Sequence, residues 1–219
     1  MSTWISKPAS LLAALALAGC TSGINVGLGL GGLSFTRAAP ERISVAGDSV
    51  IVAGPPGFCI DRSALKDSQQ GAFVLLGSCA SISRDAGQPR PDIPGLLTVS
   101  VSPLGVVSGP PDELLAGLSE YLQSPQGRAT LSRTGDASSV DILETQLDGD
   151  MLYIHARDRA GPQPEALEDD YWRALMAVDG RLVTASVVAF SRQPMTREAG
   201  LAVLDSFARR LRRENEGPR

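Results

Sequence analysis

The sequence contains few residues that carry out chemistry. Its 219 residues include one histidine, three cysteines and 5% aromatic residues. A zinc site needs several His or Cys ligands, and a redox pair favours a Cys-x-x-Cys spacing, which is absent here. The Gly-Lys-Ser/Thr ending of a phosphate-binding loop is missing as well. These absences argue against zinc, thiol-redox and P-loop proteins, and we expect no cofactor.

Lysine is also scarce, and the 24 acidic residues outnumber the 20 basic ones. The formal net charge is −4, and Lys7 and Lys66 are the only lysines. A nucleic-acid-binding surface usually carries a cluster of basic side chains. We therefore expect no nucleic acid among the partners of this protein.

The apolar run near the N-terminus, residues 9–18, has about half the length that a membrane-spanning helix needs. It follows Lys7 and ends in Leu17-Ala18-Gly19-Cys20. This segment resembles the signal peptide and lipobox of bacterial lipoproteins. The resemblance implies that Cys20 gains a diacylglyceryl thioether, that cleavage follows Gly19, and that the new amine is acylated. The alternative is an unmodified cysteine behind an ordinary signal peptide.

Lipidation of Cys20 would determine one partner, the membrane, and the location of the protein in the cell. We expect the protein to be held at a membrane through lipid on Cys20, facing the periplasm within the cell envelope. Stable anchoring takes two or more acyl chains, a requirement that a triacylated cysteine meets. An aspartate after the cysteine would resemble the inner-membrane retention signal of enteric bacteria. Thr21 stands there instead and favours the outer membrane.

With Cys20 lipidated, Cys59 and Cys79 remain as an even pair. In an oxidising compartment an even pair predicts a disulfide. Closing a loop of about twenty residues contributes roughly 3 kcal/mol on the chain-entropy estimate. The alternatives are two buried thiols or a metal pair, and the absence of a flanking histidine disfavours the metal. We predict a structural disulfide.

The chain divides into four segments. We interpret residues 1–19 as the lipoprotein signal peptide and 20–40 as the lipidated cysteine with a flexible, glycine-rich tether. Residues 41–214 form a single domain and 215–219 a disordered tail. About 200 residues remain after cleavage, enough for one domain with a sizeable core.

Turn signals divide the domain into hairpins with helices between and after them. An apolar run at 72–80 is typical of a central strand, and 96–101 alternates as a strand. Helices are predicted from about 110 to 123 and from Thr196 to Arg213. The predicted hairpins join 42–46 to 49–53 about Gly47-Asp48, 140–147 to 151–156 about Asp148-Gly149, and 171–178 to 181–190 about Asp179-Gly180.

This order predicts an α+β fold: an antiparallel sheet built from hairpins, one internal helix, and one C-terminal helix packed on the sheet. Over roughly Val45 to Leu211 the order resembles the fold of the photosystem extrinsic protein PsbP and of bacterial lipoproteins that share it. In that fold a final hairpin is followed by a helix packed across an antiparallel sheet. The resemblance is architectural.

Gly47-Asp48-Ser49-Val50 is similar to the motif of the GDSL hydrolases, whose nucleophilic serine follows the first strand. Such a serine needs a base, which that family supplies from Asp-x-x-His near the C-terminus. His155 lies in a predicted strand, with Leu152 where the aspartate belongs. A hairpin turn explains the same residues, so we predict no catalytic role for Ser49. We interpret His155 as a half-exposed strand residue rather than a ligand or base.

Two charged clusters have alternative interpretations. The acidic cluster at 165–170 lacks the ligand spacing of an EF-hand, so we interpret it as a solvated loop rather than a calcium site. The arginines at 209–213 suit the C-terminal end of a helix dipole. The alternative is contact with anionic lipid headgroups or with the acidic surface of a partner.

No catalytic set emerges from these residues. The sequence therefore predicts a non-enzymatic binding or interaction module of the envelope, whose partners are envelope proteins or cell-wall components. The alternative is an acyl hydrolase, or a carrier of a small ligand or lipid, that uses a pocket which the sequence does not reveal.

Overall fold

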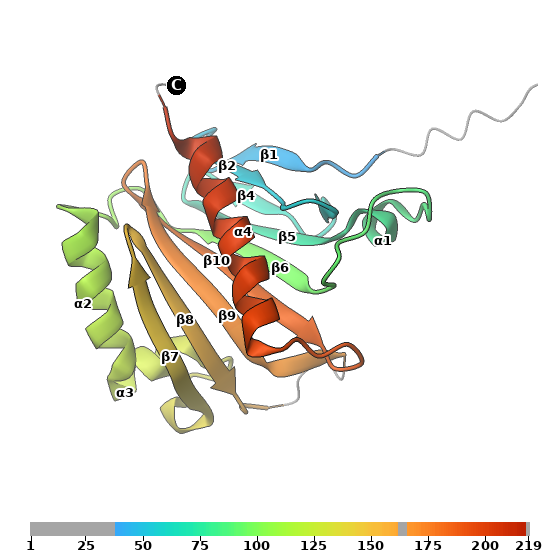
Figure 1. Cartoon of the computed structure of the whole chain (residues 1–219). Coiled ribbons are helices and arrows are strands. Elements are labelled where there is room, and N and C mark those ends of the chain that lie inside the picture. The colour runs from blue at the N-terminus through green and yellow to red at the C-terminus, as the bar shows by residue number, and fades with distance from the viewer. Residues whose placement is uncertain (1–37, 162–165, 218–219) are drawn as a thin grey trace, which may run out of the picture. The chain divides into compact units, whose positions relative to one another are not determined.

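The computed structural model describes residues 38–161 and 166–217. Cys20, the lipobox and nearly all of the predicted tether lie outside the described residues. Within them, an antiparallel sheet is flanked by helices, with α4 lying across one face (Figure 1). The predicted α+β fold class is confirmed.

The main sheet of the described chain has eight strands in the order β3-β5-β6-β10-β9-β8-β7, with β4 also pairing with β5. Neighbouring strands are antiparallel. The strand β5 lies inside the sheet, as its apolar sequence predicts. The strands are β3 (Phe58–Ile60), β4 (Lys66–Ser68), β5 (Gly71–Ser78), β6 (Leu96–Val101), β7 (Val140–Asp148), β8 (Met151–Asp158), β9 (Leu167–Val178) and β10 (Arg181–Phe190).

Two tight turns join the last four strands in pairs, β7 to β8 and β9 to β10. Asp179 and Gly180 both have positive φ, 46° and 72°, which is the signature of a type I′ turn between β9 and β10. The β7–β8 turn consists of Gly149 and Asp150, one residue later than predicted. Gly149 has a φ of 59° while Asp150 has none in the positive region, as in a type II′ turn. Both predicted hairpins are present, with the β7–β8 turn shifted by one residue.

The first hairpin forms a separate two-stranded sheet of β1 (Arg42–Val45) and β2 (Val50–Ala53). Its turn includes Gly47 and Asp48, as predicted, and both have positive φ. Because β2 buries its side chains in the same core as the main sheet, the hairpin is held by packing rather than by joining the strand order.

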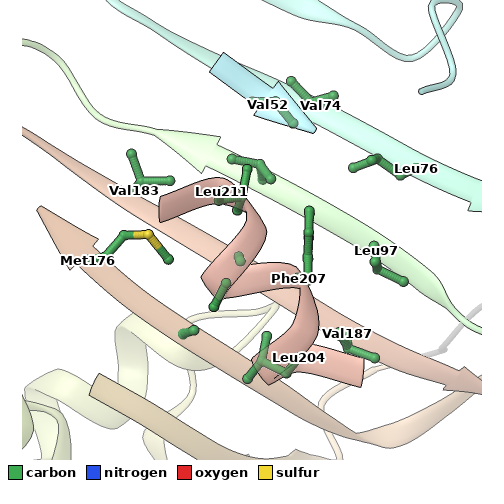
Figure 2. Packing of buried hydrophobic residues seen from close by; sticks show 14 of the residues in the cluster. Val52, Val74, Leu76, Leu97, Met176, Val183, Val187, Leu204, Phe207 and Leu211 are labelled. Carbon is green, nitrogen blue, oxygen red and sulfur yellow. The ribbon is translucent and has the colours of Figure 1, made fainter. Parts of the chain in front are cut away.

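Helix α4 (Arg197–Asn215) begins after Thr196, whose side chain accepts a hydrogen bond from the N–H of Ala199 at 3.2 Å. Its apolar side chains lie among the valines and leucines of the strands beneath (Figure 2). The helix reaches Asn215, one residue into the predicted tail. The buried residues of α4 are Gly200, Val203, Leu204, Phe207, Ala208 and Leu211.

Helices α2 (Pro111–Gln123) and α3 (Pro125–Leu131) pack on β7, β8 and β9 and form a second core on the other face of the sheet. The sequence predicts only one internal helix. Ser124 and Pro125 separate the two, because Ser124 caps α3 by accepting from the N–H of Gly127 and proline favours the first helical position. The strand β8 is consequently buried on both faces.

The predicted disulfide is present. The sulfurs of Cys59 in β3 and Cys79 are 2.04 Å apart. Cys79 begins the short helix α1 (Cys79–Ser83), so the apolar run predicted as one strand over 72–80 ends at Ser78.

Among the described residues, no helix has both the length and the apolar character needed to cross a membrane.

Candidate functional site

Ser49 and His155, the candidate nucleophile and base of a GDSL hydrolase, lie at opposite ends of α4. The hydroxyl of Ser49 donates to the carbonyl of Ala46 within the β1–β2 turn, beside a strand whose Ile51 bonds the side chain of Asn215. His155 instead lines a pocket with Arg197, the first residue of α4. A helix of this length spans roughly 27 Å, so the serine and the histidine do not form a catalytic pair.

The pocket beside His155 has a volume of about 160 Å³ and lies where α4 begins. Apolar side chains of β10 and of the segment before α4 form part of it, and acidic side chains of β9 form another part. The residues that line it are His155, Glu168, Asp170, Trp172, Val187, Ala189, Pro194, Met195, Thr196, Arg197 and Gly200.

Packing holds the ring of His155 in place. His155 and Trp172 are cross-strand partners on β8 and β9, and their rings stack with centroids 4.3 Å apart. Gly200 of α4 lets the indole lie under the helix, because a Cβ there would come within 2.7 Å of the Trp172 ring. The His155 side chain is only 12% exposed, so the prediction of a half-exposed residue is wrong. The sequence pattern of β8 did not show that α4 covers this face.

Burial favours the neutral form of the His155 imidazole. Burial lowers the pKa of His155, and the nearby Asp170 carboxylate opposes this shift without overcoming it. The two side chains are 3.7 Å apart, which is too long for a hydrogen bond. Asp170 is instead bound by the guanidinium of Arg157. No hydrogen bond within the described residues engages either ring nitrogen of His155, so the ring offers one donor and one acceptor to the pocket.

The described residues that line this pocket include no serine or cysteine. Thr196 is the hydroxyl residue of its lining, and its oxygen caps α4. The pocket combines one neutral imidazole, an apolar wall and a charged rim. Such a site is suited to holding a small molecule that carries both polar and apolar groups.

The acidic cluster predicted as a solvated loop is part of a strand. β9 begins at Leu167, so Glu168, Asp169 and Asp170 are strand residues, while Glu165 lies outside the described residues. Asp169 lies 3.7 Å from Arg133. The ion pairs of Asp169 and Asp170 direct these carboxylates towards neighbouring arginines rather than towards one metal ion.

Only one group of side chains in the described chain has a spacing compatible with a metal ion, namely Glu41 with Cys59 and Cys79. Both of these sulfurs belong to the disulfide, and a metal ligand requires the thiolate. This group is therefore the surroundings of a disulfide rather than a metal site.

Asp158 is a buried carboxylate with a structural role. It accepts hydrogen bonds from the N–H groups of Arg133 and Ala160 and from the hydroxyl of Ser139, at 2.8 to 2.9 Å. Burial alone would raise the pKa of Asp158, but these hydrogen bonds together lower it. The carboxylate ties the end of β8 to the segment that follows α3.

The arginines at the end of α4 are mostly paired within the domain. Arg209 binds Asp205 and Asp148, and Arg212 binds Asp150. Arg210 lies 3.8 Å from Glu214. Of the four, Arg213 alone has no ion pair in the described chain. A headgroup-binding cluster would therefore have only Arg213 available without the loss of an ion pair. Arg209 and Arg212 link α4 to the β7–β8 turn, and Arg210 pairs within the helix.

A second concave surface runs beside β7, the last strand of the main sheet. We name it the β7 groove; it has a volume of about 610 Å³. Leu143 and Leu147 of β7 are 46% and 49% exposed, although both are large and apolar. The residues that line the groove are Gln123, Arg128, Ala137, Ser138 and residues 140–145.

Sequence reasoning found the strand β7 but missed the groove. The alternation of residues predicts a strand, whereas its position at the edge of the sheet depends on strand order. The signal in the sequence was Leu143, which interrupts the alternation of apolar and polar residues along β7. It lies at a β-bulge between Ile142 and Glu144.

The acidic side chains of β7 are directed towards basic residues of the domain. Asp141 binds Arg159, Glu144 binds Arg197, and Asp148 binds Arg209. All six partners are at least a quarter exposed, so these pairs contribute little to stability and exchange readily.

Comparison of the chain with protein-family models, curated proteins and solved structures finds no match. The lipoprotein and PsbP-like resemblances stay predictions. Two surfaces of the described residues bear on function, the His155 pocket and the β7 groove.

Proposed function

We propose that this protein is a non-enzymatic interaction module of the bacterial cell envelope. It is anchored by lipid on Cys20, faces the periplasm and binds an envelope protein or cell-wall component. Thr21 after the cysteine favours the outer over the inner membrane. The observation that carries the proposal is the β7 groove, which adjoins an exposed sheet edge with two exposed leucines. Leu143 lines the groove and Leu147 lies beyond it on the same strand, and exposed apolar side chains beside a concave surface are typical of binding sites.

The location rests on the N-terminal sequence. The lipobox Leu17-Ala18-Gly19-Cys20 supports the anchor, and the Cys59–Cys79 disulfide is consistent with an oxidising compartment. Mass spectrometry of the mature protein tests this directly. We expect a chain that begins at Cys20 and carries acyl groups. An unmodified Cys20 would remove the anchor from the proposal.

The binding role is tested by recovery of a partner from envelope membranes after gentle solubilisation. We expect the native chain to retain a partner that the Leu143→Lys/Leu147→Lys variant loses, while Leu104→Lys keeps it. Leu104 is 68% exposed and lies outside β7, which makes it a matched control. Equal recovery by all three chains would place the binding surface elsewhere, and recovery by none would argue against an interaction module.

A carrier of a small ligand is the second candidate function. The ring nitrogens of His155, which make no hydrogen bond to the described residues, and the pocket of about 160 Å³ favour it. Native mass spectrometry of the protein purified from envelopes tests for a bound small molecule. We expect His155→Leu to release it if the carrier function holds. Esterase activity that disappears in Ser49→Ala or His155→Ala would instead support the hydrolase alternative.

A further inference from the structure

We infer that the partner binds by strand addition, as an extended segment of another polypeptide that pairs with the outer edge of β7. This inference rests on the proposed interaction function and names the kind of partner. It follows from the main chain of β7, from its side chains and from its charge.

The two edges of the main sheet are not equivalent. At one edge, β3 and β4 have three residues each, β4 carries Lys66, and the N–H of Ile60 in β3 donates to the carbonyl of Pro40 at 2.7 Å. At the other edge, β7 has nine residues and contains neither proline nor lysine, two residues that commonly protect such edges. No described strand pairs with its outer side. The edge open to a partner is therefore β7.

The β7–β8 turn determines which main-chain groups of β7 point outwards. Asp148 and Met151 flank the two-residue turn, so their main-chain groups face each other. Groups alternate between inward and outward along an antiparallel strand. Thr145 and Leu147 therefore direct their N–H and C=O groups away from β8, towards the position of an added strand.

The bulge limits how a partner can pair. It shifts the register between Ile142 and Glu144, so the regular edge runs from Glu144 to Asp148. Five residues in register span about 17 Å, which is enough for a short extended peptide. The bulge therefore prevents a partner strand from pairing continuously with all nine residues of β7.

The side chains specify the chemistry of the partner. Leu147 lies on the regular edge and Leu143 beside the bulge, and both are half-exposed, so a partner with apolar residues at alternate positions would cover them. The strand β7 carries three carboxylates and no basic residue. A second copy of this chain would place the same three carboxylates against them, which is unfavourable between paired strands. The three carboxylates pair with exposed arginines of the domain, and such pairs exchange readily, so basic residues of a partner can compete for them. An extended segment with apolar and basic residues is therefore complementary.

Site-specific photo-crosslinking in envelope membranes tests this inference. Thr145, Leu147 and, as a control, Leu104 are each replaced by benzoyl-phenylalanine in the full-length chain. We expect positions 145 and 147 to crosslink to one other polypeptide, at residues two apart in its sequence. That spacing is the register of a paired strand and would not arise from general proximity. Position 104 should give no such pair.

A charge variant supplies the second measurement. In a chain carrying Leu147→Lys, we expect the crosslink from position 145 to fall about tenfold, because the buried apolar contact is lost. The thermal unfolding midpoint should not change, since Leu147 is half-exposed.

Each contrary result has a distinct meaning. Crosslinks from β7 to a second copy of this chain, or to scattered positions, would overturn strand addition. A partner captured at position 104 alone would overturn strand addition and leave the interaction module standing. Absence of crosslinks at every position would overturn both.

Discussion

The ring of His155 stacks on that of Trp172, with centroids 4.3 Å apart and planes 5° from parallel. This contact joins β8 to β9 beneath the start of α4, and it buries the only histidine of the chain. Two measurable properties depend on this contact: the response of the fold to pH and its tolerance of a larger residue at Gly200.

We expect acid to weaken the fold through His155. The ordinary pKa of histidine is 6.5, and burial lowers the pKa of His155 in the folded protein. As the pH falls, the unfolded chain therefore binds this proton first. The stability present above pH 6.5 is lost as the pH falls through the lowered pKa. The free energy of unfolding, measured in urea between pH 8 and pH 5, should decline less steeply in His155→Gln. Identical slopes would contradict this assignment.

Gly200→Ala should destabilise the domain by about 1–3 kcal/mol, because the new Cβ would lie within 2.8 Å of the Trp172 ring. Gly117→Ala is the matched control. Gly117 also lies in a helix, but nothing lies within 4 Å of its Cβ position. That change should stabilise the protein by about 0.5–1 kcal/mol through helix propensity. Urea titration of both variants checks the difference in sign, and equal effects would show that the Trp172 contact has no energetic role.

Replacing both Cys59 and Cys79 with alanine should lower the free energy of unfolding by about 3 kcal/mol, because an open loop gives the unfolded chain more conformations. The native chain in excess dithiothreitol should lose a similar amount. The double variant should not respond to the reductant. A native chain that is indifferent to reductant would show that the disulfide contributes no stability.

Arg181→Met should cost about 3–5 kcal/mol. Arg181 is 4% exposed, and its guanidinium donates to the carbonyls of Ala46, Gln69 and Ser102. Methionine would fill much of the space but leave three carbonyls without this donor. Arg213→Met, at an exposed position, should change stability by less than about 0.5 kcal/mol. If Arg181→Met lowers the free energy of unfolding as little as Arg213→Met, the three carbonyls have found other donors.

Local signals in the sequence predicted much of this fold. Asp179-Gly180 marked a turn because few other residue pairs tolerate positive φ twice in succession. The apolar stripe of α4 similarly predicted its buried face. Helix α3 was missed because its seven residues are too few to show a period, and Ser124-Pro125 also suits a loop.

The candidate sites depended on contacts that are distant in sequence. The Cys59–Cys79 pair was found by counting cysteines, which needs no topology. The burial of His155 depends on α4, which begins more than forty residues later. The exposed edge of β7 depends on which strands pair, and a strand at an edge has the same residue alternation as one inside a sheet.

The contact between Asn215 and Ile51 bears on how the protein is made. The side chain of Asn215 bonds both the N–H and the C=O of Ile51, each at 2.8 Å, and so joins the last turn of α4 to one of the earliest described strands. Because a chain is synthesised from its N-terminus, β1 and β2 are made long before α4, which covers them. The β1–β2 hairpin is therefore not covered by α4 until nearly the whole polypeptide has been made. Until then the apolar side chains of β2 lack the helix that packs against them, so the burial of the first hairpin depends on the last helix of the chain.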